Sequence, residues 1–324
     1  MKRLVILLLC VISIAALLLF LKPAKPAQSQ AESQPQAAPV VTAAPFDSTV
    51  MLRVLTEQGT EELPLDAYLM RVLLAEMPSD FPPEALKAQA VAARTFALRR
   101  SETKKHEFAD ICSDPSCCQG CCDATEIPQS ITDAVLATDG LVMTYDGALI
   151  DATFFSCSGG KTEAALAVWG SDIPYLQSVE SPGEENAPRY TEEALLSAEY
   201  FAEVLSSAHP EVNLAGQPEN WFGACSYTEG GGVDKVFIGG AAIAGTELRK
   251  LFSLRSTKFT IAAQDGQVCI VTCGFGHRVG LSQYGAKSMA ERGAAFAEIL
   301  THYYQGAAVT QLQNPAVIVP LAAP

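Results

Sequence analysis

One glutamate, Glu76, stands out in this sequence because it falls on a helix face that is otherwise apolar. Within "LPLDAYLMRVLLAEMP", Leu65, Leu69 and Val72 precede it at helical spacing, so the four side chains share one face. Pro78 disfavours helical geometry at the residue before it, and the helix is therefore expected to end at about Glu76. The sequence thus predicts a carboxylate at the C-terminal end of a core helix.

The position of Glu76 makes its carboxyl group hard to ionise. The C-terminal end of a helix carries partial negative charge, and burial also disfavours a charged group, so both effects raise the pKa. A carboxyl group that stays protonated near neutral pH can act as the general acid in glycosidic bond cleavage. The alternative is a structural ion pair with a basic residue such as Arg94, which the spacing alone favours because ion pairs also shift pKa values.

Residues with metal-binding chemistry gather in the cysteine-rich segment 104–126. His106, Cys112 and Cys118 recur at equal intervals of six residues. Three further cysteines crowd the same segment: Cys117, Cys121 and Cys122. Disulfides are the default outside the cytoplasm, but adjacent cysteines beside a histidine favour zinc. We therefore expect a zinc site at His106, Cys112 and Cys118, and the other three cysteines either complete its shell or form a disulfide.

Two glycine-containing segments carry candidate sugar-binding side chains. "CGFGHRVGLSQYGAKSMAERG" and "FFSCSGGKTE" combine adaptable backbone with hydrogen-bonding and aromatic groups, as sugar recognition requires. The candidates are Ser156, Ser158, His277, Ser282, Gln283 and Tyr284. The first segment lacks the spacing of a dinucleotide-binding fingerprint, and the second is not the G-x-S-x-G elbow of a serine hydrolase, so both classes are disfavoured.

A mixture of helices and hairpins must position these residues. A first strand is expected near 50–55, ahead of the Glu76 helix, and Pro82-Pro83 opens a second helix that runs to about residue 103. Hairpins are expected to turn at Asp146-Gly147, Gly239-Gly240 and Asp265-Gly266, and helices are expected at 191–208, 282–292 and 296–304. Helices and antiparallel hairpins without strict alternation indicate an α+β fold, forming one catalytic domain.

The N-terminal region predicts a membrane anchor in front of that domain. Residues 4–21 form an uncharged apolar run of 18 residues, about the minimum for a transmembrane helix, and Lys2 and Arg3 precede it. This basic pair places the N-terminus in the cytoplasm, so the rest of the chain is expected outside it. The predicted organisation is an anchor at 1–21, a Pro-, Ala- and Gln-rich linker at 22–48, the folded domain at 49–310 and a tail at 311–324.

Composition narrows the class of partner. Of the 324 residues, 49% are hydrophobic, as in a globular protein with a full core. The net charge is −14, whereas binding to nucleic-acid phosphates needs clustered lysine and arginine. Nucleic acid is therefore not an expected partner.

Taken together, the motifs resemble one family, the stage II sporulation protein D family of peptidoglycan lytic transglycosylases used in endospore engulfment. The matching stretches are "LPLDAYLMRVLLAEMPSDFPPEALKAQAVAARTFAL", "FFSCSGGKTEAALAVWGSDIPYLQSVESP", "GTELRKLFSLRSTKFTI" and "GFGHRVGLSQYGAKSMAERGAAFAEILTHYYQG". They occur in one order and cover most of residues 50–306. The membrane anchor and the exported domain fit the same family.

The resemblance assigns roles to the candidate residues. It implies that Glu76 is the catalytic acid and base, that Arg94 belongs to the substrate cleft, and that the 106–118 spacing corresponds to the zinc site of clostridial members. It also implies that the substrate is the glycan strand of peptidoglycan, cleaved between N-acetylmuramic acid and N-acetylglucosamine to leave 1,6-anhydro ends. One carboxylate suffices for that reaction because the attacking hydroxyl belongs to the sugar, whereas hydrolysis usually needs two.

The resemblance also implies a setting and two rival functions. The protein is expected in the mother-cell membrane, with its domain facing the septal space and with engulfment proteins, including a cell-wall amidase, as partners. Zinc is expected to hold the 106–118 loop rather than to take part in the reaction. The rivals are a zinc-dependent hydrolase of the stem peptide or amide, and a non-catalytic glycan-binding activator of an amidase.

Overall fold

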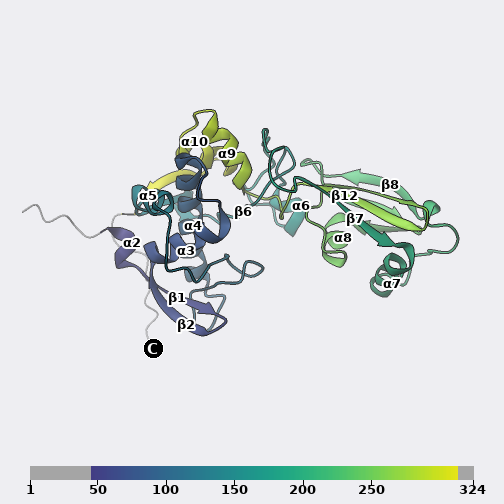
Figure 1. Cartoon of the computed structure of the whole chain (residues 1–324), viewed down its shortest axis with the longest axis horizontal. Helices are drawn as coiled ribbons and strands as arrows, with labels where there is room; N and C mark the ends of the chain where they lie inside the picture. The colour runs from purple at the N-terminus through teal and green to yellow at the C-terminus, as the bar shows by residue number, and fades with distance from the viewer. Residues whose placement is uncertain (1–44, 313–324) are drawn as a thin grey trace, which may run out of the picture. The chain divides into compact units, whose positions relative to one another are not determined.

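A computed structural model describes residues 45–312 and has the expected α+β fold (Figure 1). The chain enters through α2 (Phe46–Thr49), the hairpin β1 (Met51–Thr56) and β2 (Gly59–Pro64), then α3 (Leu65–Glu76) and α4 (Pro83–Thr103). The segments predicted for 1–21 and for residues 313–324 of the tail lie outside the described residues. Within residues 45–312, no helix is both long enough and apolar enough to cross a membrane.

The first hydrophobic core is built around α4, which is buried along most of its length (Figure 1). Alanines at Ala85, Ala88, Ala90, Ala92, Ala93 and Ala97 let other elements approach its backbone closely. The elements that pack on α4 are α3, α5 (Gln129–Ala137), β4 (Leu141–Tyr145), α9 (Gln283–Glu291) and α10 (Phe296–Tyr303). Helices from both ends of the chain therefore share one core.

Short sheets surround this core. β1 pairs antiparallel with β2 and parallel with β3 (Ile111–Cys112), while β4 pairs antiparallel with β5 (Ala148–Leu149) and β14 (Ala308–Gln311). β6 (Phe154–Phe155) pairs parallel with β13 (Leu281–Ser282), which leads directly into α9. The β6–β13 pair thus brings the two glycine-containing segments side by side, as their candidate roles require.

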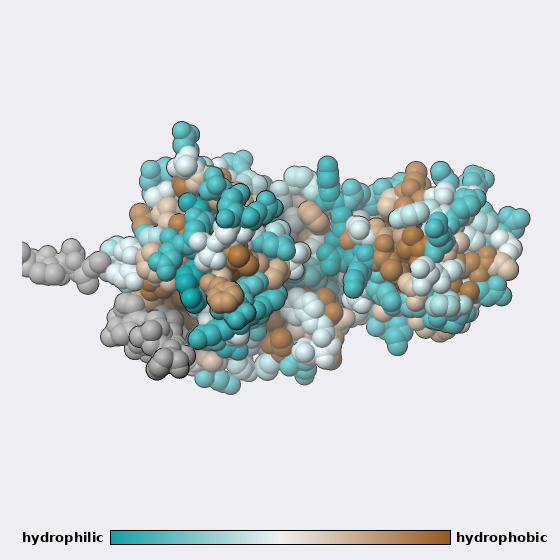
Figure 2. Space-filling model, turned by 90° about the horizontal axis from the view of Figure 1, so that it is seen from below, coloured by the Kyte–Doolittle hydropathy of each residue, from teal (hydrophilic) through white to brown (hydrophobic). Residues whose placement is uncertain are grey.

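A second, smaller core lies between two antiparallel sheets and two helices. One sheet has the order β11 (Phe259–Gln264), β12 (Gln267–Cys273), β7 (Thr191–Ser197), and the other has β10 (Ala241–Ala244), β9 (Val233–Ile238), β8 (Phe222–Tyr227). The remaining elements are α6 (Ala165–Trp169), α7 (Ala198–Ala208), η1 (Pro218–Asn220) and α8 (Gly245–Leu251). Hydrophilic side chains cover most of the face seen in Figure 2, with hydrophobic residues in small groups.

A buried ion pair ties the 158–163 segment to the 230–278 segment. Arg278 Nη1 lies 3.0 Å from Glu163 Oε1, and both side chains are almost inaccessible to solvent. Arg278 also donates to the carbonyls of Ser158 at 2.7 Å and Gly230 at 2.6 Å. Because every charge here has a partner, the pair can remain buried, and removal of either member would leave an uncompensated charge.

The structure confirms most of the expected elements and corrects one. The helix that ends at Glu76, the helix from Pro83 to Thr103 and the three hairpin turns all occur where they were expected. The helix expected over 191–208 is wrong, because residues 191–197 form strand β7 and only residues 198–208 form helix α7. Strand β7 pairs with β12 along seven residues, so tertiary pairing overrides the local helix propensity.

Candidate active site

Glu76 occupies the last position of α3, where its backbone geometry follows from the neighbouring sequence. Met77 is extended, with φ −138° and ψ 134°, as expected for a residue before proline. Leu65, Leu69 and Val72 are fully buried on the same helix face. The buried apolar residues therefore fix the helix in the core, and Glu76 lies at its C-terminal end.

Two donors hold the Glu76 carboxylate, and neither carries a charge. The backbone N–H of Gly120 donates to Oε1 at 3.0 Å, and Gln283 Nε2 donates to Oε2 at 3.3 Å. Burial raises the pKa of Glu76 above its ordinary value, and the two hydrogen bonds offset this only in part. Among residues 45–312, no basic side chain forms an ion pair with Glu76. The group is thus arranged to hold a proton at a higher pH than an ordinary glutamate.

The approach of Gly120 to Glu76 depends on the absence of a side chain. A Cβ atom at position 120 would lie 2.8 Å from Glu76 Oε1, closer than carbon and oxygen can normally come. Gly120 lies in the cysteine-rich segment, so the position of that segment determines one of the two hydrogen bonds to Glu76. Gly120 was not among the predicted site residues, although a glycine between two cysteine pairs, "CCQGCC", was a visible signal.

Gln283 reaches Glu76 because a buried carboxylate fixes the start of α9. Ser282 is the N-cap of α9, and its hydroxyl accepts from the Gly285 N–H at 3.2 Å while it donates to Glu184. Glu184 Oε2 also accepts from the Ser158 hydroxyl and N–H, both at 2.7 Å. Glu184 therefore joins the two glycine-containing segments and positions the helix that carries Gln283. Glu184 was not among the predicted site residues, because nothing local in "SPGEEN" sets it apart from its neighbours.

Aromatic side chains lie close to this carboxylate site. Tyr284 follows Gln283 and packs edge-on against Phe81, with ring centroids 5.1 Å apart. The Tyr284 N–H donates to the Ser156 carbonyl at 3.0 Å, and the side chains of Ser156 and Tyr284 are both half-buried. These two candidates remain accessible for contacts with a ligand.

His277 forms a small cluster with Trp169 and Phe155. Its ring centroid lies 5.3 Å from that of Trp169 and 5.5 Å from that of Phe155. Burial, together with the positive charge of Arg249, lowers the pKa of His277 to about 4. His277 is therefore neutral at physiological pH, and its Nδ1 accepts the Val279 N–H at 3.1 Å.

Three of the predicted substrate-binding residues have side chains that are fully buried and contact other parts of the protein. Arg94 is fully buried and pairs with Asp47 through Nη2–Oδ2 at 2.6 Å, so the alternative of an ion pair between Arg94 and Glu76 is wrong. Ser158 and Ser282 are also fully buried and donate to Glu184. The geometry gives these three residues positioning roles, and their direct contact with substrate stays a prediction.

Four other carboxylates, Asp80, Asp151, Glu163 and Asp172, have different surroundings. Asp151 lies 3.6 Å from Arg100, Glu163 pairs with Arg278, and Asp172 accepts from Gln177 at 3.3 Å. Asp80 is exposed. Glu76 differs from these four carboxylates because it is partly buried and has two neutral donors, an arrangement suited to a reaction that needs one acid and base.

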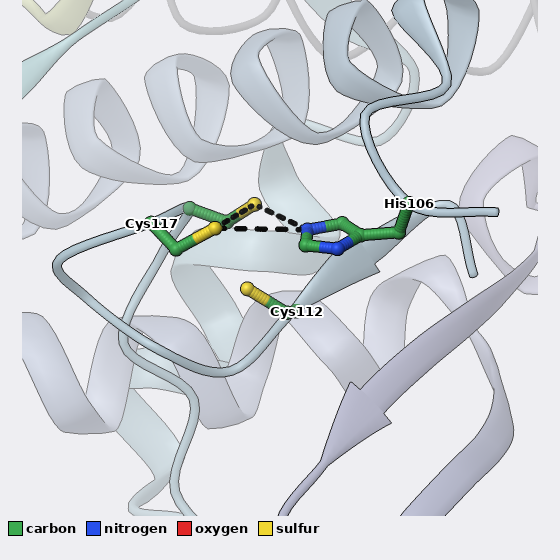
Figure 3. Close-up of side chains that lie close together, drawn as sticks. His106, Cys112 and Cys117 are labelled. Carbon is green, nitrogen blue, oxygen red and sulfur yellow. Dashed lines mark hydrogen bonds between the residues drawn. The ribbon is translucent and has the colours of Figure 1, made fainter. Parts of the chain in front are cut away.

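The potential metal ligands converge on one point (Figure 3). The ligand atoms of His106, Cys112, Cys117 and Cys118 all lie within 4.8 Å of one another. His106 Nε2 lies 3.4 Å from Cys118 Sγ and 3.7 Å from Cys117 Sγ, and the two sulfurs are 3.9 Å apart. Zinc–sulfur bonds of about 2.3 Å in a tetrahedron place sulfurs about 3.8 Å apart, so the residues fit zinc.

The remaining cysteines of the segment lie outside this group. The Cys122 thiol is 3.2 Å from the Arg71 carbonyl, and Cys121 packs at the edge of the first core. All nine cysteines among the described residues are free thiols. Cys117 is thus the cysteine that joins the three ligands expected from the six-residue spacing, and a shell of four protein ligands is typical of a structural zinc site.

Comparison with known proteins gives consistent matches. A family model described as "Stage II sporulation protein" matches residues 56–145, which include Glu76 and the cysteine-rich segment. Stage II sporulation protein D of Bacillus amyloliquefaciens is 36% identical over 273 residues, which cover 80% of this chain and 78% of that protein. Its counterpart in Bacillus subtilis is 35% identical over 271 residues, 78% of this chain and 76% of that protein. The amidase enhancer of Bacillus subtilis is 28% identical over 294 residues, 75% of this chain and 40% of that protein.

Proposed function

Because this chain belongs to the stage II sporulation protein D family, we propose that it is a lytic transglycosylase that cleaves the glycan strands of peptidoglycan. Cleavage falls between N-acetylmuramic acid and N-acetylglucosamine and leaves 1,6-anhydro ends. The observation that carries the proposal is the Glu76 carboxyl group, which is partly buried, has two neutral donors and has a raised pKa.

In the proposed reaction Glu76 acts first as an acid and then as a base. Its carboxyl proton passes to the glycosidic oxygen as the bond from that oxygen to the anomeric carbon of muramic acid breaks. The muramic C6 hydroxyl then bonds to the anomeric carbon and gives its proton to the Glu76 carboxylate. The ring closes, the proton returns to the enzyme, and no water is consumed. A single carboxylate suffices because the nucleophile is part of the substrate.

The groups around Glu76 have distinct parts in this scheme. The Gly120 N–H and the Gln283 amide stabilise the carboxylate after it has lost its proton, without fixing a charge beside it. The half-buried ring of Tyr284 offers an apolar face and a hydroxyl group to a sugar residue. Neutral His277 and exposed Trp169 extend the surface available to the glycan.

Zinc has a structural part in the proposal. His106, Cys112, Cys117 and Cys118 would hold the ion, which would fix the cysteine-rich segment when bound. That segment supplies the Gly120 N–H to Glu76, so its order determines the position of the acid. With four protein ligands in reach, little room is left for the metal-bound water that a zinc hydrolase needs, and the hydrolase alternative is disfavoured.

The relative named amidase enhancer supports a second candidate, a non-catalytic glycan-binding activator of a cell-wall amidase. Substitution of Glu76 distinguishes the two proposed functions. An activator would bind glycan and stimulate an amidase equally well with Glu76→Gln, whereas a transglycosylase would lose cleavage.

We further propose that the protein works in endospore engulfment, and the names of two relatives, stage II sporulation protein D, support a role in sporulation. The anchor expected at residues 4–21 would hold it in the mother-cell membrane, with the domain in the septal space. Glycan strands and a cell-wall amidase would be its partners there.

Digestion of purified glycan strands with the full-length chain tests the proposal. Mass spectrometry of the fragments is expected to find 1,6-anhydro-muramic ends with the wild type and none with Glu76→Gln. Glu62→Gln is the matched control, because Glu62 is exposed on β2 and is not one of the proposed site residues. Reducing ends would indicate a hydrolase, free stem peptides would indicate an amidase, and either result would refute the proposal.

A further inference from the structure

A pocket of about 920 Å³ outside the immediate surroundings of Glu76 has a positively charged lining. Its lining residues include Arg249 and Lys250 from α8, Arg255 from the loop that follows, Phe275 and Glu192. The pocket is thus lined by three basic residues and one acidic residue, whereas acidic residues outnumber basic ones by 36 to 22 in the whole chain. Basic groups gathered in a pocket of an acidic protein attract anions.

Among the described residues, Arg249 is the partly buried basic residue of this pocket that has no carboxylate partner. Its side chain is partly buried, and burial lowers its pKa. Within residues 45–312 it forms no ion pair, and its Nε donates only to the Arg255 carbonyl at 3.4 Å. The buried arginines Arg94 and Arg278, in contrast, each have a carboxylate partner. A partly desolvated guanidinium without a carboxylate leaves its terminal donors for a ligand.

Arg255 and Phe275 also line the pocket. The Arg255 guanidinium lies over the Phe275 ring, 4.3 Å from its centroid, and forms an ion pair with Glu192. Phe275 remains 41% exposed. The pocket therefore combines an exposed apolar ring with fixed positive charge, which suits a ligand that has both apolar surface and carboxylates.

Two links connect this pocket with the candidate active site. Ser116 lines the pocket and belongs to the cysteine-rich segment, four positions before Gly120, whose N–H binds Glu76. Arg249 also lies close enough to His277 for its charge to lower the pKa of that ring. The pocket and the candidate active site thus share the cysteine-rich segment and the surroundings of His277.

From these contacts we propose that Arg249, Lys250 and Arg255 form a subsite for carboxylate groups carried by the peptidoglycan strand. The carboxylates belong either to the lactyl groups of muramic acid or to the stem peptides. Arginine binds a carboxylate through two parallel hydrogen bonds, so Arg249 carries most of the recognition and Lys250 adds charge. This inference rests on the proposed function, since it names the substrate feature that the same site recognises.

The test measures binding without cleavage, in the full-length chain carrying Glu76→Gln. Three ligands are compared: strands with stem peptides, strands stripped of stem peptides, and chitin oligosaccharides, which have no carboxylate. Arg249→Gln is expected to raise the dissociation constant for at least one carboxylate-bearing strand by 10-fold or more, in line with the loss of a charged hydrogen-bonding group. Chitin binding should not change. The strand that is affected identifies the source of the carboxylate.

Two further variants keep the result interpretable. Lys250→Gln changes an exposed side chain of the same pocket and is expected to weaken binding in the same direction by a smaller factor. Lys235→Gln is the control, because Lys235 is an exposed lysine on β9 that does not line the pocket. Equal affinity of Arg249→Gln and Lys235→Gln for all strands would overturn the inference, as would an equal loss of chitin binding.

The outcome is separate from that of the proposed function. If wild-type protein produced no anhydro ends while Arg249→Gln still lost affinity for carboxylate-bearing strands, the catalytic proposal would fail and the subsite would stand. If cleavage occurred and binding did not depend on Arg249, the subsite would fail alone.

Discussion

The buried pair of Asp47 and Arg94 gives a quantitative prediction that separates a structural role of Arg94 from a substrate-binding one. Asp47 accepts three hydrogen bonds from Arg94, two from Nε at 2.9 Å and one from Nη2 at 2.6 Å. Both side chains are almost fully buried. Asp47→Asn keeps the shape but removes the charge, so the guanidinium would remain buried without a counter-ion.

We expect Asp47→Asn to lower the free energy of unfolding by about 3–5 kcal/mol, the usual cost of breaking a buried pair from one side. For a domain of this size the melting temperature should fall by on the order of 10 °C. In the double variant Asp47→Leu with Arg94→Met no charge is left unpaired, and most of the lost stability should return. If Arg94 has a structural role, these variants are expected to change stability with little effect on glycan affinity per folded molecule.

Urea denaturation followed by circular dichroism, together with glycan binding at a temperature where each variant is folded, measures both quantities. A loss of less than about 1 kcal/mol in Asp47→Asn would contradict the reasoning. So would a double variant that regained stability but lost glycan binding, because Arg94 would then contact the substrate as the sequence analysis expected.

Three further predictions concern the site. Chelation, or Cys118→Ser, should remove one zinc ion per chain and lower the melting temperature, and cleavage should be lost as the segment around Gly120 loses order; a metal content that does not change would refute this role. Glu76→Gln should be more stable than wild type at pH 7 but not at pH 4. Burial raises the pKa of Glu76 in the folded protein, so ionisation of Glu76 lowers the stability as the pH rises above the ordinary glutamate pKa of 4.5. Equal stability of the two proteins at every pH in this range would contradict the raised pKa. Glu184→Gln should cost roughly 3 kcal/mol, because several buried donors lose a charged acceptor; it should also lower cleavage with little change in the affinity for glycan, and a variant with wild-type stability would contradict the positioning role.

Local features of the sequence were enough to place Glu76 and the metal ligands. The apolar spacing of α3 and the proline after it fix the end of that helix, and both signals lie within a few residues of Glu76. The ligands His106, Cys112 and Cys118 lie within thirteen positions of one another, so their pattern survives in the sequence. Cys117 was left open, because adjacent cysteines cannot be ranked as ligands without the turn that orients them.

The contacts that were missed join residues that are distant in sequence. Gln283 lies 207 positions from Glu76, and Glu184 lies 98 positions from Ser282. The spacing of residues within one helix or strand therefore could not predict either contact. The helix expected over 191–208 is wrong at residues 191–197 for the same reason, since β12 supplies the hydrogen bonds that make this segment a strand. Asp47 lies in the expected linker, yet it is buried against Arg94, which only the packing of α2 reveals.

The most direct measurement of the central claim is digestion of glycan strands in water enriched in heavy oxygen, followed by mass spectrometry of the new ends. If the muramic hydroxyl attacks within the sugar and Glu76 returns the proton, the ends will be anhydro-muramic residues without heavy oxygen, and Glu76→Gln will form none. Ends that carry heavy oxygen, or cleavage that persists in Glu76→Gln, would contradict the proposed mechanism.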